Sequence, residues 1–229
     1  MTDDSTSLEL AAPRRRRADE PVRPRDAERT KAAILRAARD EFSEQGLNGA
    51  RVDAIAARAK ANKRLLYHYF GNKEALYAAV LLDAYQEIRH GEHELTLSQH
   101  DPIEAMDRLV RFTFRHFLAN QWFPRLLAIE NLQNARFLKK LKDIPALHSP
   151  LVNELRDILK RGADSGVFRR DVDPLQLYIS IAGLGYFYVS NMNTLSVIFG
   201  RDLSQFAMIQ DREAQAVQMV LDYLRTKRA

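Results

Sequence analysis

Four side chains that can contact phosphates or bases lie within eight positions of one another, between Lys63 and Phe70. They are Lys63, Arg64, Tyr67 and His68. The two cations can pair with phosphates, while the phenol and the imidazole can hydrogen-bond to phosphate oxygens or base edges. On a helix these positions share one face, because residues three and four apart are neighbours. The pattern predicts a short helix whose outer face binds nucleic acid.

Two short helices and a tight turn between Arg51 and Phe70 are expected to position this face. The first helix is indicated by apolar residues at the spacing i, i+3, i+4, i+7, namely Val52, Ile55, Ala56 and Ala59. Asn62 can cap a second helix, and Leu66 and Phe70 would hold it against the first. This is a helix-turn-helix, whose second helix fits the major groove of DNA. The alternative is an ordinary helical pair with a charged, solvated face.

The flanking sequence strengthens the first interpretation. The segment from Thr30 to Leu81 resembles the N-terminal domain of TetR-family transcriptional regulators. The residues that carry the resemblance are a helix ending at Phe42 and Gly46, the Ile55-Ala56 core and the run from Leu66 to Leu76. We expect a DNA-binding domain over residues 27–73, with Arg51, Asn62 and Lys73 joining the four residues above. Lys73 opens the next helix, where backbone N–H groups can also face phosphate.

Two positions depart from the family's usual pattern. Family members commonly have Gly where this chain has Lys60, and Thr or Ser where it has Arg51. A left-handed backbone at Lys60 should cost on the order of 1 kcal/mol, because a side chain disfavours that conformation. Arg51 lacks the hydroxyl that would cap the helix but brings a charge able to reach phosphate.

Charge and composition agree with a nucleic-acid partner. Residues 1–73 contain 16 Lys and Arg against 11 Asp and Glu, whereas residues 74–229 contain 19 of each. An excess confined to one end suits the neutralisation of phosphates. The chain has 229 residues and no cysteine, so it has no disulfide framework. Its N-terminus lacks the apolar core of a signal peptide, and we expect a cytoplasmic protein.

Three regions are expected along the chain. Residues 1–26, with the run from Arg14 to Arg17, are expected to form a disordered basic arm. The arm either contacts phosphate or the minor groove, or it is a solvated tail without effect on DNA. Residues 27–73 form the helix-turn-helix domain, and residues 74–229 a helical domain for effector binding and dimerisation.

The fold class expected is all-α, with about nine helices. Helix starts are indicated where a capping residue precedes proline, at Asp101-Pro102, Ser149-Pro150 and Asp173-Pro174. A further helix is expected from about Pro124 to Lys140. Residues 175–189 are apolar almost all round but are too few to span a membrane, so we expect burial and no membrane partner.

Two C-terminal helices resemble the pair through which the family dimerises as a four-helix bundle. Small residues, Ala182 and Gly185, would let a neighbouring helix approach closely. The last helix repeats apolar or small residues at coiled-coil-like spacing, namely Ala214, Val217, Leu221 and Leu224. These six residues are the expected homodimer interface. The alternative is that both helices are core of one subunit.

Aromatic and polar residues mix on the helices of the second region. Candidates for lining a pocket are Phe114, Phe117, Trp122, Glu130, Asn131, Tyr178 and Tyr186. A concave apolar site with a few polar groups is suited to a small molecule. The resemblance implies that an effector bound there shifts the two DNA-reading heads. Each of these residues could instead be ordinary core.

Catalytic motifs are absent from the sequence. There is no glycine-rich phosphate loop and no nucleophile elbow or zinc-protease motif. His90, His93 and His100 are close in sequence, but we expect solvated loop residues and no metal or cofactor. The function expected is a ligand-responsive regulator, a repressor in most of the family, released from a palindromic operator by a small molecule. The alternatives are an all-helical enzyme and a module whose basic end binds an acidic protein.

Overall fold

The computed structural model describes residues 24–142 and 144–225. Within these ranges the regular structure is helical, apart from one isolated β-bridge between Phe168 and Arg225. The elements are α1 (Pro24–Gly49), α2 (Val52–Arg58), α3 (Lys63–Phe70), α4 (Lys73–Glu94), η1 (Leu97–Gln99), α5 (Pro102–Ala119), α6 (Trp122–Leu132), η2 (Leu138–Lys140), α7 (Ile144–Asp164), α8 (Pro174–Phe199) and α9 (Phe206–Leu224). The expected all-α class with about nine helices is confirmed.

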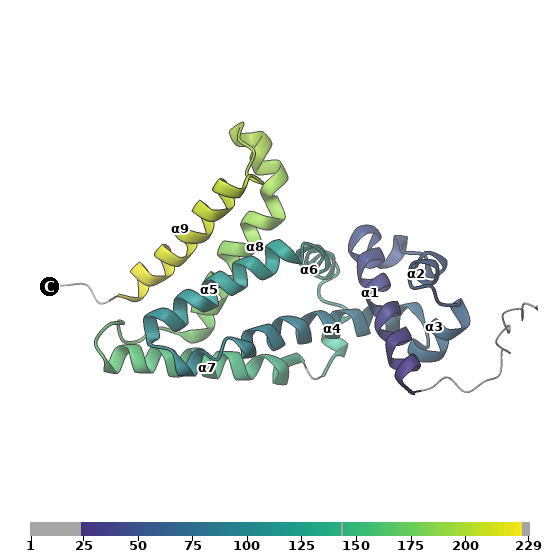
Figure 1. Ribbon diagram of the computed structural model, residues 1–229, viewed down its shortest axis with the longest axis horizontal. Coiled ribbons are helices and arrows are strands. Elements are labelled where there is room, and N and C mark those ends of the chain that lie inside the picture. The colour runs from purple at the N-terminus through teal and green to yellow at the C-terminus, as the bar shows by residue number, and fades with distance from the viewer. Residues whose placement is uncertain (1–23, 143, 226–229) are drawn as a thin grey trace, which may run out of the picture.

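The molecule is elongated, with α1, α2 and α3 at one end (Figure 1). α4 runs from this end into the body, where it lies beside α7. In the body α5 is central and packs against α7, α8 and α9. None of the helices in the described ranges has both the length and the apolarity needed to cross a membrane.

Two of the three expected cap-proline helix starts are confirmed. Asp101 accepts hydrogen bonds from the backbone N–H groups at the start of α5, and Asp173 does the same for α8. The start at Ser149-Pro150 is wrong, because α7 begins at Ile144 and runs through Pro150. The Ser149 hydroxyl donates to the Pro145 carbonyl instead of capping a helix. Pro150 lies inside the helix, at its seventh residue, and has no N–H to donate to the carbonyl four residues earlier.

The single helix expected from Pro124 to Lys140 is also wrong. α6 ends at Leu132, and Asn134 and Ala135 adopt left-handed backbone with φ of 54° and 55°. The buried Glu130 carboxylate then accepts hydrogen bonds from the N–H groups of Phe137 and Leu138. A side chain therefore fixes the turn between α6 and η2.

The N-terminal end has a core that it shares with the body. The cluster contains Phe42 of α1, Leu66 of α3 and Tyr77 of α4, together with Leu126 of α6 and Phe137 beside η2. The ring centroids of Phe42 and Tyr77 are 5.1 Å apart, and those of Tyr77 and Phe137 are 5.2 Å apart. The boundary expected at residue 73 therefore does not divide two separate cores.

The expected basic arm is only partly described. Helix α1 begins at Pro24, so residues 24–26 are helical and do not belong to the arm. Residues 1–23, including Arg14 to Arg17, lie outside the described residues. The helix end expected near Gly46 is seen as a break in α1, where Gly46 has φ 66° and the next residue, Leu47, is buried.

Candidate nucleic-acid interface

The turn before α3 adopts the strained geometry expected at Lys60, whose φ is 51°. After the turn, the Asn62 side chain accepts a hydrogen bond of 3.0 Å from the Leu65 N–H and so caps α3. Leu66 is fully buried and Phe70 half-buried, which fixes the rotation of the helix about its axis. The side chain of Asn62 thus has a structural task in addition to the DNA contact predicted for it.

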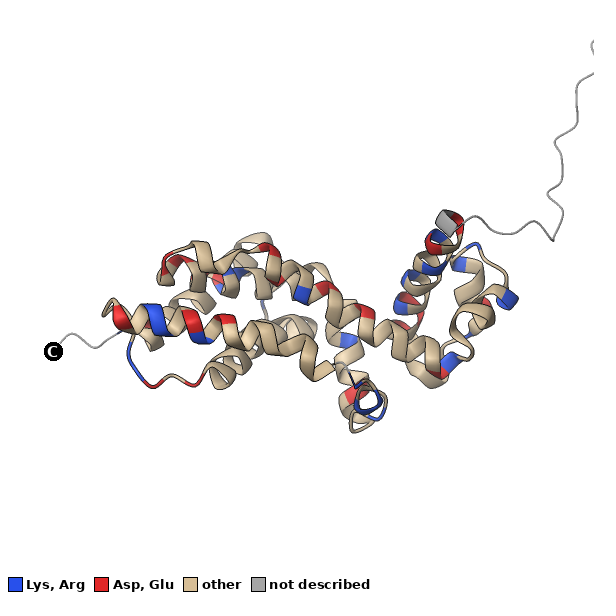
Figure 2. Ribbon diagram, turned by 90° about the horizontal axis from the view of Figure 1, so that it is seen from below, with Lys and Arg blue, Asp and Glu red and all other residues tan. Residues whose placement is uncertain are grey.

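The outer face of α3 carries the four residues singled out by the sequence. Lys63, Arg64, Tyr67 and His68 are all exposed, and Lys and Arg positions lie on several helices of this end (Figure 2). Lys63 is not free, because its Nζ lies 2.9 Å from Asp53 Oδ1. The hydrogen bond and charge of Asp53 raise the pKa of Lys63. A phosphate would have to compete with this carboxylate for Lys63.

Arg51 and Lys73 flank this face. Arg51 precedes α2 and has an exposed side chain, while its backbone N–H donates to the carboxylate of Glu41 at 3.0 Å. Glu41 therefore supplies an acceptor at a helix start that lacks a hydroxyl. Lys73 is half-buried at the start of α4, which Asn72 caps, and its Nζ donates to the Asn48 carbonyl at 3.4 Å.

This arrangement is a helix-turn-helix with a polar, basic reading helix, and two family models match the chain. The model described as "Bacterial regulatory proteins, tetR family" matches residues 34–80. The model described as "Tetracyclin repressor-like, C-terminal domain" matches residues 102–220, more than half of the chain. The chain belongs to the TetR family. Like the family, it is a ligand-responsive, DNA-binding transcriptional regulator.

Individual relatives agree with this assignment. The HTH-type transcriptional repressor NicS of Pseudomonas putida is 37% identical over 195 residues, which cover 85% of this chain and 89% of NicS. The repressor SCO4008 of Streptomyces coelicolor is 58% identical over 57 residues, or 25% of this chain and 30% of that protein. The crystal structure of SCO4942, also from Streptomyces coelicolor, has a TM-score of 0.64 at 27% identity, covering 85% of this chain and 98% of that one.

The seven residues proposed for a pocket do not surround one space. Phe114 and Phe117 are buried in an aromatic cluster with Phe123, and Tyr186 lies edge-on to Phe117. Glu130 closes the η2 turn, and Asn131 is exposed. Glu130 is accounted for by its structural hydrogen bonds, and for Asn131 the pocket role stays a prediction.

Trp122 and Tyr178 have other partners. The indole ring of Trp122 stacks under the Arg39 guanidinium at 4.3 Å, so it joins α6 to α1 of the reading head. Arg39 Nη1 also lies 3.6 Å from Glu87 of α4. The Tyr178 hydroxyl of α8 accepts a hydrogen bond of 2.7 Å from Arg89 of α4.

The structure places a cavity of about 500 Å³ between α4 and α7. Arg89 and Glu92 of α4 line it, with Nη1 and Oε2 2.7 Å apart and side chains 8% and 2% exposed. Burial raises the pKa of Glu92 to about 8, against the opposing effect of Arg89. Sequence reasoning missed both residues. The signal was present, since Tyr85, Arg89 and Glu92 follow the i, i+4, i+7 spacing of an inward face.

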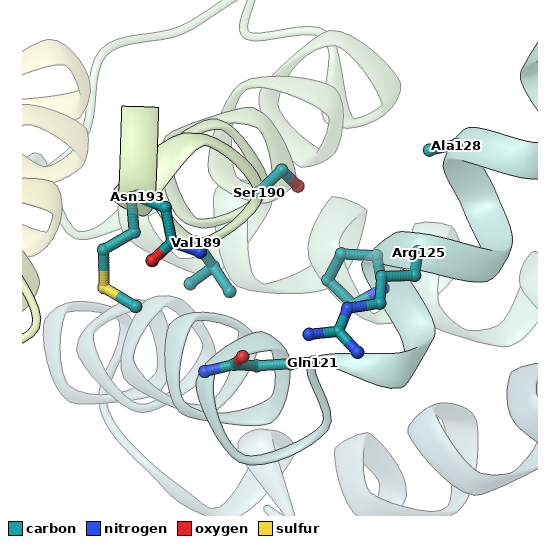
Figure 3. Close-up of a pocket in the computed structure, with 8 residues that line it drawn as sticks. Gln121, Arg125, Ala128, Val189, Ser190 and Asn193 are labelled. Carbon is teal, nitrogen blue, oxygen red and sulfur yellow. The ribbon is translucent and has the colours of Figure 1, made fainter. Parts of the chain in front are cut away.

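A smaller cavity of about 150 Å³ lies between α6 and α8. Figure 3 shows Gln121 and Arg125 extending towards Val189 across this gap. A cavity of this size holds a molecule no larger than about benzene. We therefore take the α4–α7 cavity as the better candidate for an effector.

Most of the predicted dimer interface is internal to the subunit. Val217, Leu221 and Leu224 are buried in the core that α9 shares with α5 and α7. A Cβ at Gly185 would lie 3.3 Å from the Phe114 Cα, so Gly185 serves close packing of α8 on α5. The prediction is wrong for these four residues, because the spacing identified a buried face and not a free one. Ala182 is half-buried and Ala214 is exposed, and for them it stays a prediction.

The three histidines do not form a metal site. His90 Nε2 lies 3.3 Å from Glu94 Oε1, and His100 Nδ1 lies 3.4 Å from Glu104 Oε1. No group of three or more possible ligands comes together in the part of the chain that the structure describes. His90 and His93 belong to α4 and not to a loop, which corrects that expectation.

Proposed function

We propose that this regulator is a repressor that binds a palindromic operator as a homodimer, with α3 of each subunit in a major groove. The observation that carries the proposal is the exposed face of Lys63, Arg64, Tyr67 and His68 on a helix that Asn62 caps and Leu66 anchors. We expect Arg51 and Lys73 to add phosphate contacts. Because its proposed target is genomic DNA, we place the protein in the cytoplasm. We also expect it to have no catalytic activity.

We propose that the dimer forms through outward faces of α8 and α9. Leu175, Ile179 and Phe187 lie on one stripe of α8 at multiples of four residues and are 50%, 53% and 58% exposed. Met219 and Tyr223 of α9 are exposed beside them, and a groove of about 510 Å³ runs between the two helices. A contiguous exposed apolar surface of this kind marks an interaction site. A two-fold dimer also suits two half-sites about 34 Å apart.

We propose that a small-molecule effector in the α4–α7 cavity lowers operator affinity. The supporting geometry is α4 itself, since one continuous helix carries Lys73 at the reading head and Arg89 at the cavity. Arg39 further connects the head to Glu87 and Trp122. Effector binding and DNA binding must then weaken each other by the same factor.

A selection of bound fragments from the source genome, followed by titration of the enriched sequence, tests the proposal. We expect a two-fold symmetric sequence and a steep loss of affinity as salt is raised. Arg64→Ala should weaken binding by about tenfold or more and relax base preference, since a base contact is worth roughly 1–3 kcal/mol. The matched control is Arg170→Ala, an exposed arginine between α7 and α8. A folded Arg64→Ala protein with unchanged affinity and preference would contradict the proposal.

A further inference from the structure

The cavity between α4 and α7 has an apolar wall and a polar wall. The apolar wall comes from α7 and consists of Ala146, Leu147, Pro150 and Leu151. The polar wall comes mainly from α4, where Arg89 and Glu92 contribute a charged pair. A site with this composition holds an apolar body against one side and orients a polar group at the other.

Some buried polar atoms of the Arg89–Glu92 pair have no hydrogen-bond partner. Arg89 uses Nη1 towards Glu92 Oε2 and Nη2 towards the Tyr178 hydroxyl, both at 2.7 Å. Arg89 Nε and Nη1 and both carboxylate oxygens of Glu92 are buried and have no hydrogen-bond partner, although Nη1 and Oε2 are close enough to form an ion pair. A buried polar atom without a partner costs about 1–3 kcal/mol. The pair therefore lacks acceptors for Arg89 N–H groups and donors for the Glu92 oxygens.

The charges around the cavity discriminate between possible ligands. Above its raised pKa Glu92 neutralises Arg89, and Glu154 also lines the cavity. A carboxylate could accept from Arg89 Nε but would face two other carboxyl groups. An ammonium group could donate to Glu92 Oε1 but would leave the Arg89 N–H without an acceptor and add a cation beside it. A neutral amide has both a donor and an acceptor and brings no net charge.

We propose that this cavity binds a small apolar molecule bearing a neutral amide or lactam group, which accepts from Arg89 and donates to Glu92. That such a ligand also releases the protein from DNA rests on the function proposed above. Binding itself is a property of the subunit and is measured without DNA.

Three probes of nearly equal shape test the assignment, namely phenylacetamide, phenylacetate and phenethylammonium. Each is titrated by ligand-observed NMR into the full chain at pH about 9, above the raised pKa of Glu92. We expect phenylacetamide to bind at least about tenfold more tightly than the other two. Tightest binding of either charged probe, or no binding of any probe at millimolar concentration, would overturn the proposal.

Two variants and a control test whether phenylacetamide binds in the α4–α7 cavity. Ala146→Trp fills the cavity from an exposed position on α7, so the fold should persist and phenylacetamide binding should be lost. Glu92→Gln removes the countercharge of Arg89, so the affinity for phenylacetate should rise relative to that for phenylacetamide. Glu94→Gln, at an exposed position on the same helix, should leave the relative affinities unchanged. Unchanged phenylacetamide binding by a folded Ala146→Trp protein would overturn the proposed site. Loss of binding with intact operator recognition leaves the regulator's function standing.

Discussion

Lys60 shows how one side chain can be held in an unfavourable backbone conformation by its surroundings. Its φ of 51° is kept although glycine would adopt it more easily. We predict that Lys60→Gly raises the free energy of unfolding by roughly 0.5–1 kcal/mol. Lys60→Ala is the control, because it removes the charge but retains the strain. Urea denaturation measures both, and equal stability of the two variants would argue against backbone strain at this position.

His116 should make the protein sensitive to acid. Burial lowers the pKa of His116 to about 4, and the charge of Arg89 lowers it further in the same direction. Between the ordinary value near 6.5 and about 4, the unfolded chain binds the proton and the folded chain does not. Stability contributed by neutral His116 is therefore lost as pH falls through this range.

The test compares the wild type with His116→Leu, in which the titrating group is replaced by an apolar one among the surrounding phenylalanine rings. Unfolding free energies at pH 7 and pH 4.5 are measured by urea denaturation. We expect the wild type to lose more stability between these values than the variant does. An identical loss in both proteins would show that His116 does not contribute to acid sensitivity.

At the scale of the elements, the ion pair between α2 and α3 sets how freely the reading helix can meet phosphate. Asp53 holds Lys63 at 2.9 Å and is itself exposed on the same end of the molecule. We predict that Asp53→Asn increases affinity for duplex DNA of any sequence by about threefold to tenfold at low salt, because it removes a negative charge near phosphates. Asp157→Asn, on α7, is the control. Fluorescence anisotropy with a labelled duplex measures the effect, and weaker binding by Asp53→Asn would contradict it.

Local sequence signals predicted some elements well and others poorly. The inward residues Leu66 and Phe70 and the cap Asn62 were sufficient to predict α3, since all three act within one helix. Ser149-Pro150 failed because packing of α7 on the body outweighs a local start signal. The turn after α6 depends on the Glu130 carboxylate reaching Phe137, a contact that no periodic pattern indicates.

Predictions that depended on a neighbouring helix were the least secure. The repeat of Val217, Leu221 and Leu224 correctly indicated a buried face, but it could not indicate that α5 and α8 of the same subunit pack against α9. The pocket prediction failed for a related reason, because aromatic composition does not distinguish packed core from the lining of a cavity. The spacing of Arg89 and Glu92 could indicate an inward face of α4, but it could not indicate that α7 lies opposite and forms a cavity with them.

For the whole molecule, the exposed apolar stripe of α8 should decide the oligomeric state. We predict that Phe187→Glu converts a dimer into a monomer, because it puts a charge into the proposed seam. Leu132→Glu is the control, since Leu132 is 86% exposed on α6, away from this surface. Sedimentation velocity distinguishes the two states. A Phe187→Glu protein that remains dimeric would place the interface elsewhere.

The core that joins the reading head to the body limits how freely heads could be exchanged between relatives. A chimera cut at Lys73 would keep α1, α2 and α3 but receive Leu126 and Phe137 equivalents from a foreign body. Unless those side chains match the space beside Phe42 and Leu66 of the retained head, the graft would enclose a void or a clash. Engineered sensors built on this scaffold should therefore transplant α6 and the η2 turn together with the head.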